Sequence, residues 1–125
     1  MAELSETRHN KVLLAKQKQS TLIVTPAGDT VGFNDGDLQS ELRVLMSLLD
    51  GTNLKNVAVD LGGANYFGTV IIGCITSLGQ KAEEVGGQLI ICNSSEEMLG
   101  IMRVMHLGER WPNFETLRAG LKELK

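Results

Sequence analysis

Residues 57–73 read VAVDLGGANYFGTVIIG, and they carry the strongest structural signal in the chain. The apolar residues 57–59 do not alternate with polar ones, which is typical of a central strand covered on both faces. Asp60 closes this strand, and a glycine-rich connection over residues 62–68 leads into a helix. The apolar residues that mark one face of this helix are Ile71, Ile75, Leu78, Ala82 and Val85. A buried strand followed by a turn and an amphipathic helix indicates an α/β layer.

The residues before this strand have the pattern of a hairpin followed by a first helix. The apolar runs 12–14 and 21–25 indicate two strands joined by a polar turn. A loop rich in glycine, aspartate and asparagine follows over residues 29–36. Asp37 is placed to cap a helix that ends at Gly51. The apolar residues at helical spacing in that helix are Leu38, Leu42, Leu45 and Leu49.

The chain after it predicts one more strand and two more helices. Residues 88–92 are rich in apolar residues and form the strand, and Ser94 with Glu97 is a capping box that opens a helix. Gly108 ends that helix, and Asn113 is placed to cap a last one. The methionines at helical spacing, expected in the core or on an adaptable partner surface, are Met98, Met102 and Met105. The inward residues of the last helix are Phe114, Leu117, Leu121 and Leu124.

Strands and helices alternate after the hairpin, so the predicted class is α/β. We expect a single-layer mixed sheet of four to five strands with about four helices. At 125 residues the chain has room for one core. We therefore expect a short flexible N-terminal tail over residues 1–9 and a single domain over residues 10–125.

Composition excludes several classes of function. A net charge of −3 provides no basic excess for phosphate backbones, so no nucleic-acid partner is expected. The richest apolar run, residues 70–75, is far shorter than the roughly 20 residues that cross a bilayer, so no direct membrane insertion is expected. The polar first ten residues carry no signal peptide, which predicts a cytoplasmic protein.

The residues that carry enzymatic chemistry are sparse. His9 and His106 have no nucleophile or carboxylate partner nearby in the sequence, and we expect His106 to be a surface or helix-end cation. Cys74 and Cys92 lack metal-ligand or redox spacing, which favours buried structural roles over metal or redox ones. Asp60 is best explained as an aspartate that holds a turn. We therefore expect no enzyme, no cofactor and no metal site.

Thr69 is the residue whose position suggests regulation. It follows Gly68 and precedes an apolar helical run, so it is a candidate N-cap. A phosphoryl group there would meet unpaired backbone N–H groups and the positive end of the helix dipole. It would also place about −1.5 to −2 charges beside the apolar residues Tyr66, Phe67 and Val70. Simple capping and regulatory phosphorylation both remain open on this chemistry.

The same stretch resembles the STAS domain family of anti-sigma factor antagonists and their relatives. The segment 60–64, DLGGA, is similar to the family's D-L-S-G-V segment, and 68–73, GTVIIG, to its D-S-S-G-L-G. The resemblance continues through residues 86–92, GGQLIIC, and through the Leu-Gly pair at 107–108. It covers roughly residues 10–124. One departure is clear, because Gly68 stands where the family has an aspartate.

The resemblance implies a STAS-like fold and a protein-binding function switched by phosphorylation at Thr69. The implied partners are a serine/threonine kinase of the anti-sigma type, a PP2C-type phosphatase and other STAS proteins. The implied partner-binding residues are Asp35, Asn65, Tyr66, Phe67, Gly68 and Val70. The alternative is an unphosphorylated scaffold, or an accessory subunit of a signalling complex or a membrane transport system. An unrecognised small enzyme is the third hypothesis.

Overall fold

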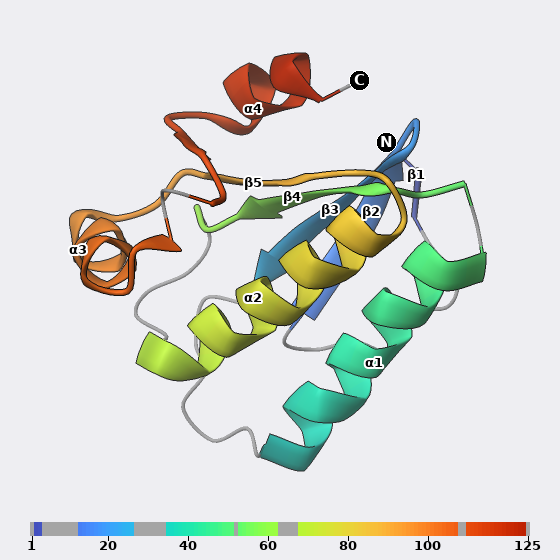
Figure 1. Cartoon of the computed structure of the whole chain (residues 1–125), viewed down its shortest axis with the longest axis horizontal. Coiled ribbons are helices and arrows are strands. Elements are labelled where there is room, and N and C mark those ends of the chain that lie inside the picture. The colour runs from blue at the N-terminus through green and yellow to red at the C-terminus, as the bar shows by residue number, and fades with distance from the viewer. Residues whose placement is uncertain are drawn as a thin grey trace.

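The computed structural model describes residues 2–3, 13–26, 35–51, 53–62, 68–107 and 110–124. For residues 2–3, 35–37, 51 and 68–71 it describes the backbone alone. The elements in chain order are β1 (Ala2–Glu3), β2 (Leu13–Lys18), β3 (Thr21–Pro26), α1 (Asp35–Gly51), β4 (Asn56–Asp60), α2 (Gly68–Glu84), β5 (Leu89–Cys92), α3 (Glu96–Val104), β6 (Asn113–Phe114) and α4 (Leu117–Glu123) (Figure 1).

Within the described residues, the strands form one mixed sheet in the order β1-β2-β3-β4-β5-β6. The pairs β1–β2 and β2–β3 are antiparallel, and the pairs from β3 to β6 are parallel. The predicted α/β class, with a mixed sheet and four helices, is confirmed. The short edge strands β1 and β6 were not predicted. Ala2 and Glu3, which the sequence assigned to a flexible tail, pair with Gln17 and Lys16 of β2.

The hairpin is longer than its apolar residues indicated. β2 continues to Lys18, four residues beyond the apolar run that ends at Leu14, because its polar residues still pair with β3. Burial alternates along β2, so one face of this strand is solvated. The turn residue Gln19 has a φ of 54°, in the left-handed region that two-residue hairpin loops require.

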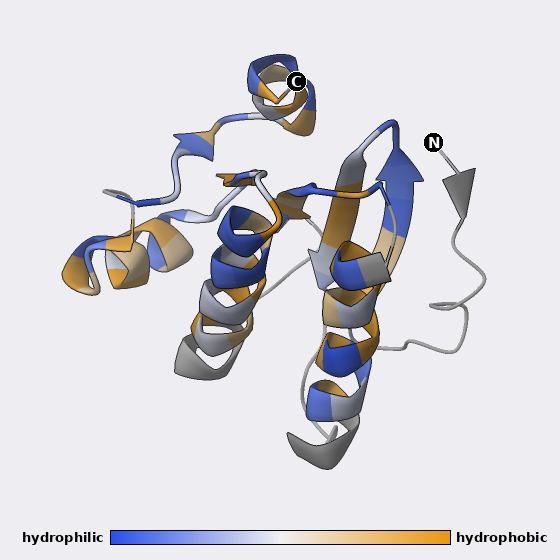
Figure 2. Cartoon of the chain, turned by 45° about the vertical axis from the view of Figure 1, so that its right-hand side comes forward, coloured by the Kyte–Doolittle hydropathy of each residue, from blue (hydrophilic) through white to orange (hydrophobic). Residues whose placement is uncertain are grey.

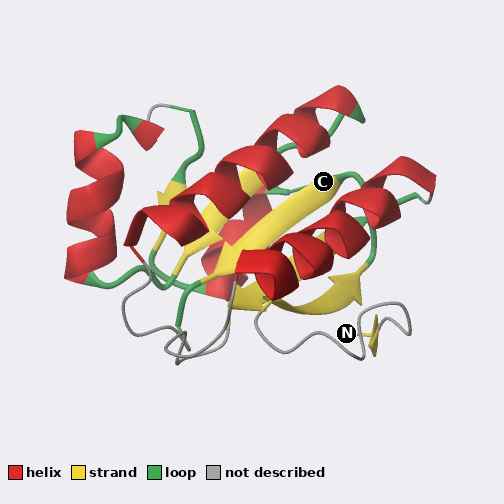
Figure 3. Ribbon diagram, turned by 90° about the horizontal axis from the view of Figure 1, so that it is seen from below, coloured by secondary structure: helices red, strands yellow, loops and turns green. Residues whose placement is uncertain are grey.

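The sheet separates two layers of apolar packing. α1 and α2 lie side by side across one face, and α4 lies on the other (Figures 1 and 3). Apolar residues gather on the sides of α1 and α2 that face the sheet (Figure 2). In β4, Val57 and Val59 belong to the core beneath α1 and α2, whereas Ala58 packs toward α4 with Ile23 and Ile90. The prediction of a central strand covered on both faces is therefore confirmed.

The predicted helix faces are also confirmed where the structure describes their side chains. The residues of the first two helices that are buried as expected are Leu38, Leu42, Leu45, Leu49, Ile75, Leu78 and Ala82. Met98 and Met102 are buried on α3, but Met105 is 45% exposed because α3 ends at Val104. Leu117, Leu121 and Leu124 pack against the other face of the sheet, as expected, but Phe114, predicted in the same helix, belongs to β6 and packs beside them.

Trp111 is a core residue that the sequence analysis did not identify. It is 2% exposed and packs against α2 at Gly79, where a Cβ atom would overlap the indole ring. The guanidinium of the neighbouring Arg110 lies 4.9 Å from the ring centroid and donates two hydrogen bonds to the Glu83 carboxylate, at 3.1 and 2.7 Å. The segment before β6 is thereby fixed to α2.

The predicted caps after β5 were wrong by a few residues. Ser95, not Ser94, caps α3, because its Oγ accepts from Met98 N at 3.2 Å. Ser94 Oγ instead donates to Asn113 Oδ1 at 3.0 Å. Asn113 belongs to β6 and does not cap a helix; Thr116 caps α4, and its Oγ1 accepts from Ala119 N at 3.1 Å.

Two other predicted helix ends differ from the structure. α1 begins at Asp35, so Asp37 lies inside its first turn and is not the cap. Asp35 itself is helical, although the sequence placed it in a loop. α3 ends at Val104, and the predicted terminator Gly108 lies outside the described residues. The Met105 N–H that closes the helix bonds to the carbonyl of Ile101 at 3.0 Å.

Candidate functional site

The candidate site lies where the parallel strands end and the helices begin. β3, β4 and β5 run parallel, and each is followed by a helix, so α1, α2 and α3 all start at the same edge of the sheet. We call this edge, with Asp60, Gly62, Asn93 and the first turns of α1 and α2, the carboxyl edge. Binding sites in α/β sheets form preferentially at such edges.

Asp60 organises the exit of the central strand. Its Oδ1 accepts a hydrogen bond from Gly62 N at 2.9 Å and another from Asn93 Nδ2 at 2.9 Å. The first bond closes the turn after β4, and the second ties this turn to the end of β5. The prediction that Asp60 holds a turn is therefore confirmed.

Asn93 is a site residue that the sequence reasoning missed. Its φ is 56°, a left-handed conformation that asparagine tolerates better than most residues. Its backbone N–H donates to Phe114 O at 3.2 Å while its side chain reaches Asp60. A Cβ at Gly62 would lie 3.1 Å from Asp60 Oδ1 and 3.3 Å from Asn93 Cβ, so the turn fits a glycine closely. An asparagine directly after a strand was the available signal.

Thr69 lies in the first turn of α2 and not at its cap. The helix begins at Gly68, one residue earlier, so the predicted N-cap role is wrong. The first four N–H groups of a helix have no partner inside it, and Thr69 contributes one of them. The first turn of α2 also contains no acidic residue that could offset the positive end of the dipole. The backbone around Thr69 is therefore suited to an added anion.

The predicted partner-binding residues fall into two groups. Gly68 and Val70 flank Thr69 in the first turn of α2, and Asp35 is the first residue of α1 at the same edge. The structure thus brings the backbones of these residues to the carboxyl edge. The predictions for Asn65, Tyr66 and Phe67 lie outside the described residues.

The remaining reactive side chains are placed as structural residues. Cys74 and Cys92 are buried and unpaired with each other, which confirms the prediction of buried free thiols. Burial raises the pKa of the Cys74 thiol to about 11. Burial, with a smaller contribution from the Asp60 charge, raises the pKa of Cys92 to about 12. His106 is exposed just beyond α3 with a φ of 59°. Among the described residues, no cluster of three His, Cys, Asp or Glu could hold a metal ion.

The sequence matches the family model of the STAS domain over residues 13–120. The chain belongs to the STAS domain family. This confirms the resemblance carried by residues 57–73, and the match spans every described strand and helix except β1 and the end of α4. No curated protein matches the chain in a sequence comparison.

Solved structures of STAS proteins share this fold. An anti-sigma-factor antagonist (STAS) domain protein from Planctomyces limnophilus superposes with a TM-score of 0.75 at 17% identity, covering 90% of this chain and 97% of its own. The anti-sigma factor antagonist SpoIIAA in its unphosphorylated form gives 0.75 at 11% identity, covering 90% and 95%. The Bacillus cell fate determinant SpoIIAA in its phosphorylated form gives 0.71 at 12% identity, covering 90% and 98%.

The described helices of this STAS domain do not have the dimensions of membrane spans. Within the described ranges, none combines the length and the apolar character that crossing a bilayer needs.

Proposed function

We propose that this STAS domain is a phosphoregulated protein-interaction domain that acts as an anti-sigma factor antagonist in a cytoplasmic partner-switching system. Thr69 is the phosphoacceptor in this proposal. Its partners are a serine/threonine kinase of the anti-sigma type, which phosphorylates it, and a PP2C-type phosphatase, which removes the phosphate. The observation that carries the proposal is the position of Thr69 in the first turn of α2, within the segment that resembles the family's phosphoacceptor motif.

Two further features support a phosphate-dependent surface. The fold resembles that of SpoIIAA, a protein solved in both an unphosphorylated and a phosphorylated form. A phosphate on Thr69 would add about −1.5 to −2 charges at the positive end of α2, a contact worth roughly 0.3–1 kcal/mol per charge. A partner that covers this edge would have to remove water from the phosphate, which costs binding free energy. Phosphorylation therefore weakens binding of the partner that recognises the free hydroxyl.

Phosphorylation by a candidate kinase tests the site directly. The chain is incubated with ATP and an anti-sigma-type kinase from the same genome, and the product is mapped by mass spectrometry. Transfer of the γ-phosphoryl group to Thr69 Oγ1 adds one phosphate and releases ADP. Thr69→Ala abolishes the added mass, and Thr69→Ser retains it. Thr76→Ala is the matched control, because Thr76 lies on the same helix with its hydroxyl donating to Ile72 O at 2.9 Å.

Gly68 favours a second candidate function, the unphosphorylated scaffold or accessory subunit. The family's aspartate is absent at this position, which removes one element that a kinase could recognise. If wild type takes no phosphate but Gly68→Asp does, the site has lost its kinase substrate role and the scaffold function replaces our proposal. A stable assembly in light scattering that persists in Thr69→Ala supports the same conclusion.

A further inference from the structure

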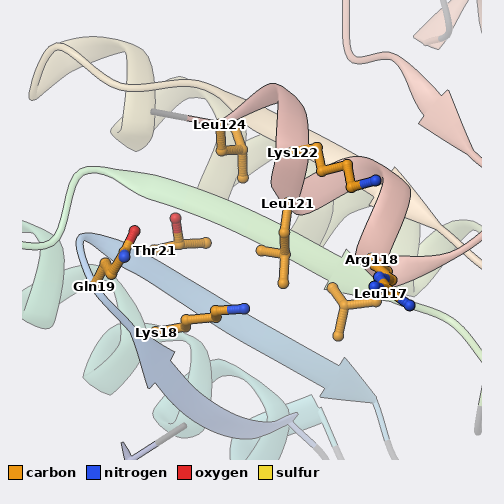
Figure 4. Close-up of a pocket in the computed structure, with 8 residues that line it drawn as sticks. All are labelled: Lys18, Gln19, Thr21, Leu117, Arg118, Leu121, Lys122 and Leu124. Atoms are coloured by element: carbon orange, nitrogen blue, oxygen red, sulfur yellow. The ribbon is translucent and has the colours of Figure 1, made fainter.

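A groove lies between α4 and the β2–β3 hairpin, away from the carboxyl edge. Its volume is about 630 Å³, within the roughly 300–1,000 Å³ typical of small-molecule sites. Lys18 and Thr21 border it from the hairpin, and Leu121 points from α4 toward the sheet between them (Figure 4). Thr21 begins β3, whereas the proposed phosphoacceptor follows the carboxyl end of β4. The groove is therefore separate from the candidate site.

One wall of the groove is an apolar strip along α4. Leu117, Leu121 and Leu124 have a spacing of four and three residues, so they lie on one side of the helix, and each is half-buried. At 1.5 Å per residue the strip is about 10 Å long. α4 is held close to β5 by Gly120, where a Cβ would overlap the Ile90 side chain. The helix thus contacts the sheet at β5, and the groove opens on the side of β2.

The rim of the groove is positively charged. Lys18, Arg118 and Lys122 all line it and are exposed, and no acidic side chain lines it among the residues that the structure describes. Arg118 and Lys122 are four residues apart on α4, where like charges destabilise a helix slightly. None of these cations forms an ion pair with another described residue. Three unpaired cations around an apolar strip, in a chain of net charge −3, form an environment complementary to an anionic amphiphile.

We propose that this groove binds a medium-chain acyl carboxylate. The carboxylate sits among Lys18, Arg118 and Lys122, where the Arg118 guanidinium can donate two N–H groups to its two oxygens. The acyl chain lies over the parts of Leu117, Leu121 and Leu124 that the sheet leaves uncovered along the groove. The length of the strip, about 10 Å, selects a single chain of medium length.

Titration with sodium decanoate tests the proposal on the full chain. At neutral pH decanoate is an anion, and calorimetry together with backbone amide NMR should show saturable binding to one site. The amide shifts should centre on Lys18, Thr21 and Leu121. Arg118→Glu replaces an attraction with a repulsion and should weaken binding by about tenfold. Arg103→Glu, a change of an exposed arginine on α3, should bind like wild type.

Ligand controls separate charge from apolar contact. Decyltrimethylammonium has the same chain with a cationic head and should not bind, and butyrate should bind far more weakly than decanoate. Equal binding of decanoate to wild type and Arg118→Glu would overturn the proposal, as would equal binding of the cationic analogue. The proposal would also be overturned if decanoate does not bind while the chain sediments with anionic vesicles, or while an acidic peptide shifts the same amides. Thr69→Ala should bind decanoate normally, so this result and the phosphorylation result are independent.

Discussion

Replacing Asp60 with alanine should loosen the carboxyl edge by a measurable amount. The Asp60 carboxylate accepts hydrogen bonds from Gly62 N and Asn93 Nδ2, each at 2.9 Å. A hydrogen bond to a charged group contributes about 1.5–3 kcal/mol, and solvent access at this edge reduces that value. We therefore expect Asp60→Ala to lower the free energy of unfolding by about 2 kcal/mol.

The assay is urea unfolding followed by the fluorescence of Trp111, the only tryptophan, which is 2% exposed. Asp60→Asn keeps an acceptor oxygen and should cost about half as much. Asp50→Ala is the control, because the Asp50 side chain is 62% exposed where it pairs with Lys81. Its loss should stay within about 1 kcal/mol. A loss below about 0.5 kcal/mol in Asp60→Ala, with an unchanged urea slope, would show that these two hydrogen bonds do not stabilise the carboxyl edge.

Two more predictions concern packing and titration. Gly79→Ala should destabilise the fold by about 1–3 kcal/mol in the same urea assay, because its Cβ would overlap Trp111. Gly73→Ala on the same helix is the control: its Cβ meets nothing within 4 Å, so this change should be neutral or stabilising. Equal effects of the two changes would contradict close packing of Trp111 against Gly79. Cys74 and Cys92 should resist a thiol reagent at pH 8 in the folded state. Their folded pKa values of about 11 and 12 lie above the ordinary value of 9.0, so stability from the neutral thiols is full below pH 9 and falls as pH rises toward 11–12. The Cys74→Ala/Cys92→Ala variant should lose this part of the fall in unfolding free energy with pH. An unchanged fall would show that the buried thiols do not cause it.

The sequence predicted the elements and their buried faces well because burial leaves a periodic trace. The unbroken apolar run at Val57 to Val59 placed β4 in the centre, and the spaced leucines of α1 all proved buried. The helix caps were predicted less well. Ser94 and Ser95 are adjacent, and either can cap a helix. Ser94 instead donates a hydrogen bond to Asn113, which lies 19 residues later in the sequence, and Ser95 is the cap.

The candidate site was predictable only in part. Thr69 could be placed at the start of α2, and Asp60 could be assigned to a turn, from local sequence alone. The bond from Asn93 to Asp60 joins residues 33 positions apart, so it depends on the parallel register of β4 and β5. The burial of Trp111 also depends on residues far apart in the sequence. Gly79 leaves space for the indole ring on α2, and β5 and α3 lie between α2 and Trp111 in the chain. Strand register and close packing between distant segments leave no pattern in the local sequence.

The proposed switch is tested by measuring how tightly the anti-sigma-type kinase binds this chain before and after phosphorylation of Thr69. Both forms are titrated onto the kinase by calorimetry at the same ionic strength. We predict that the unphosphorylated chain binds and that phosphorylation weakens binding by at least about tenfold, or roughly 1.4 kcal/mol. Equal affinity of the two forms would contradict the phosphorylation switch at the start of α2.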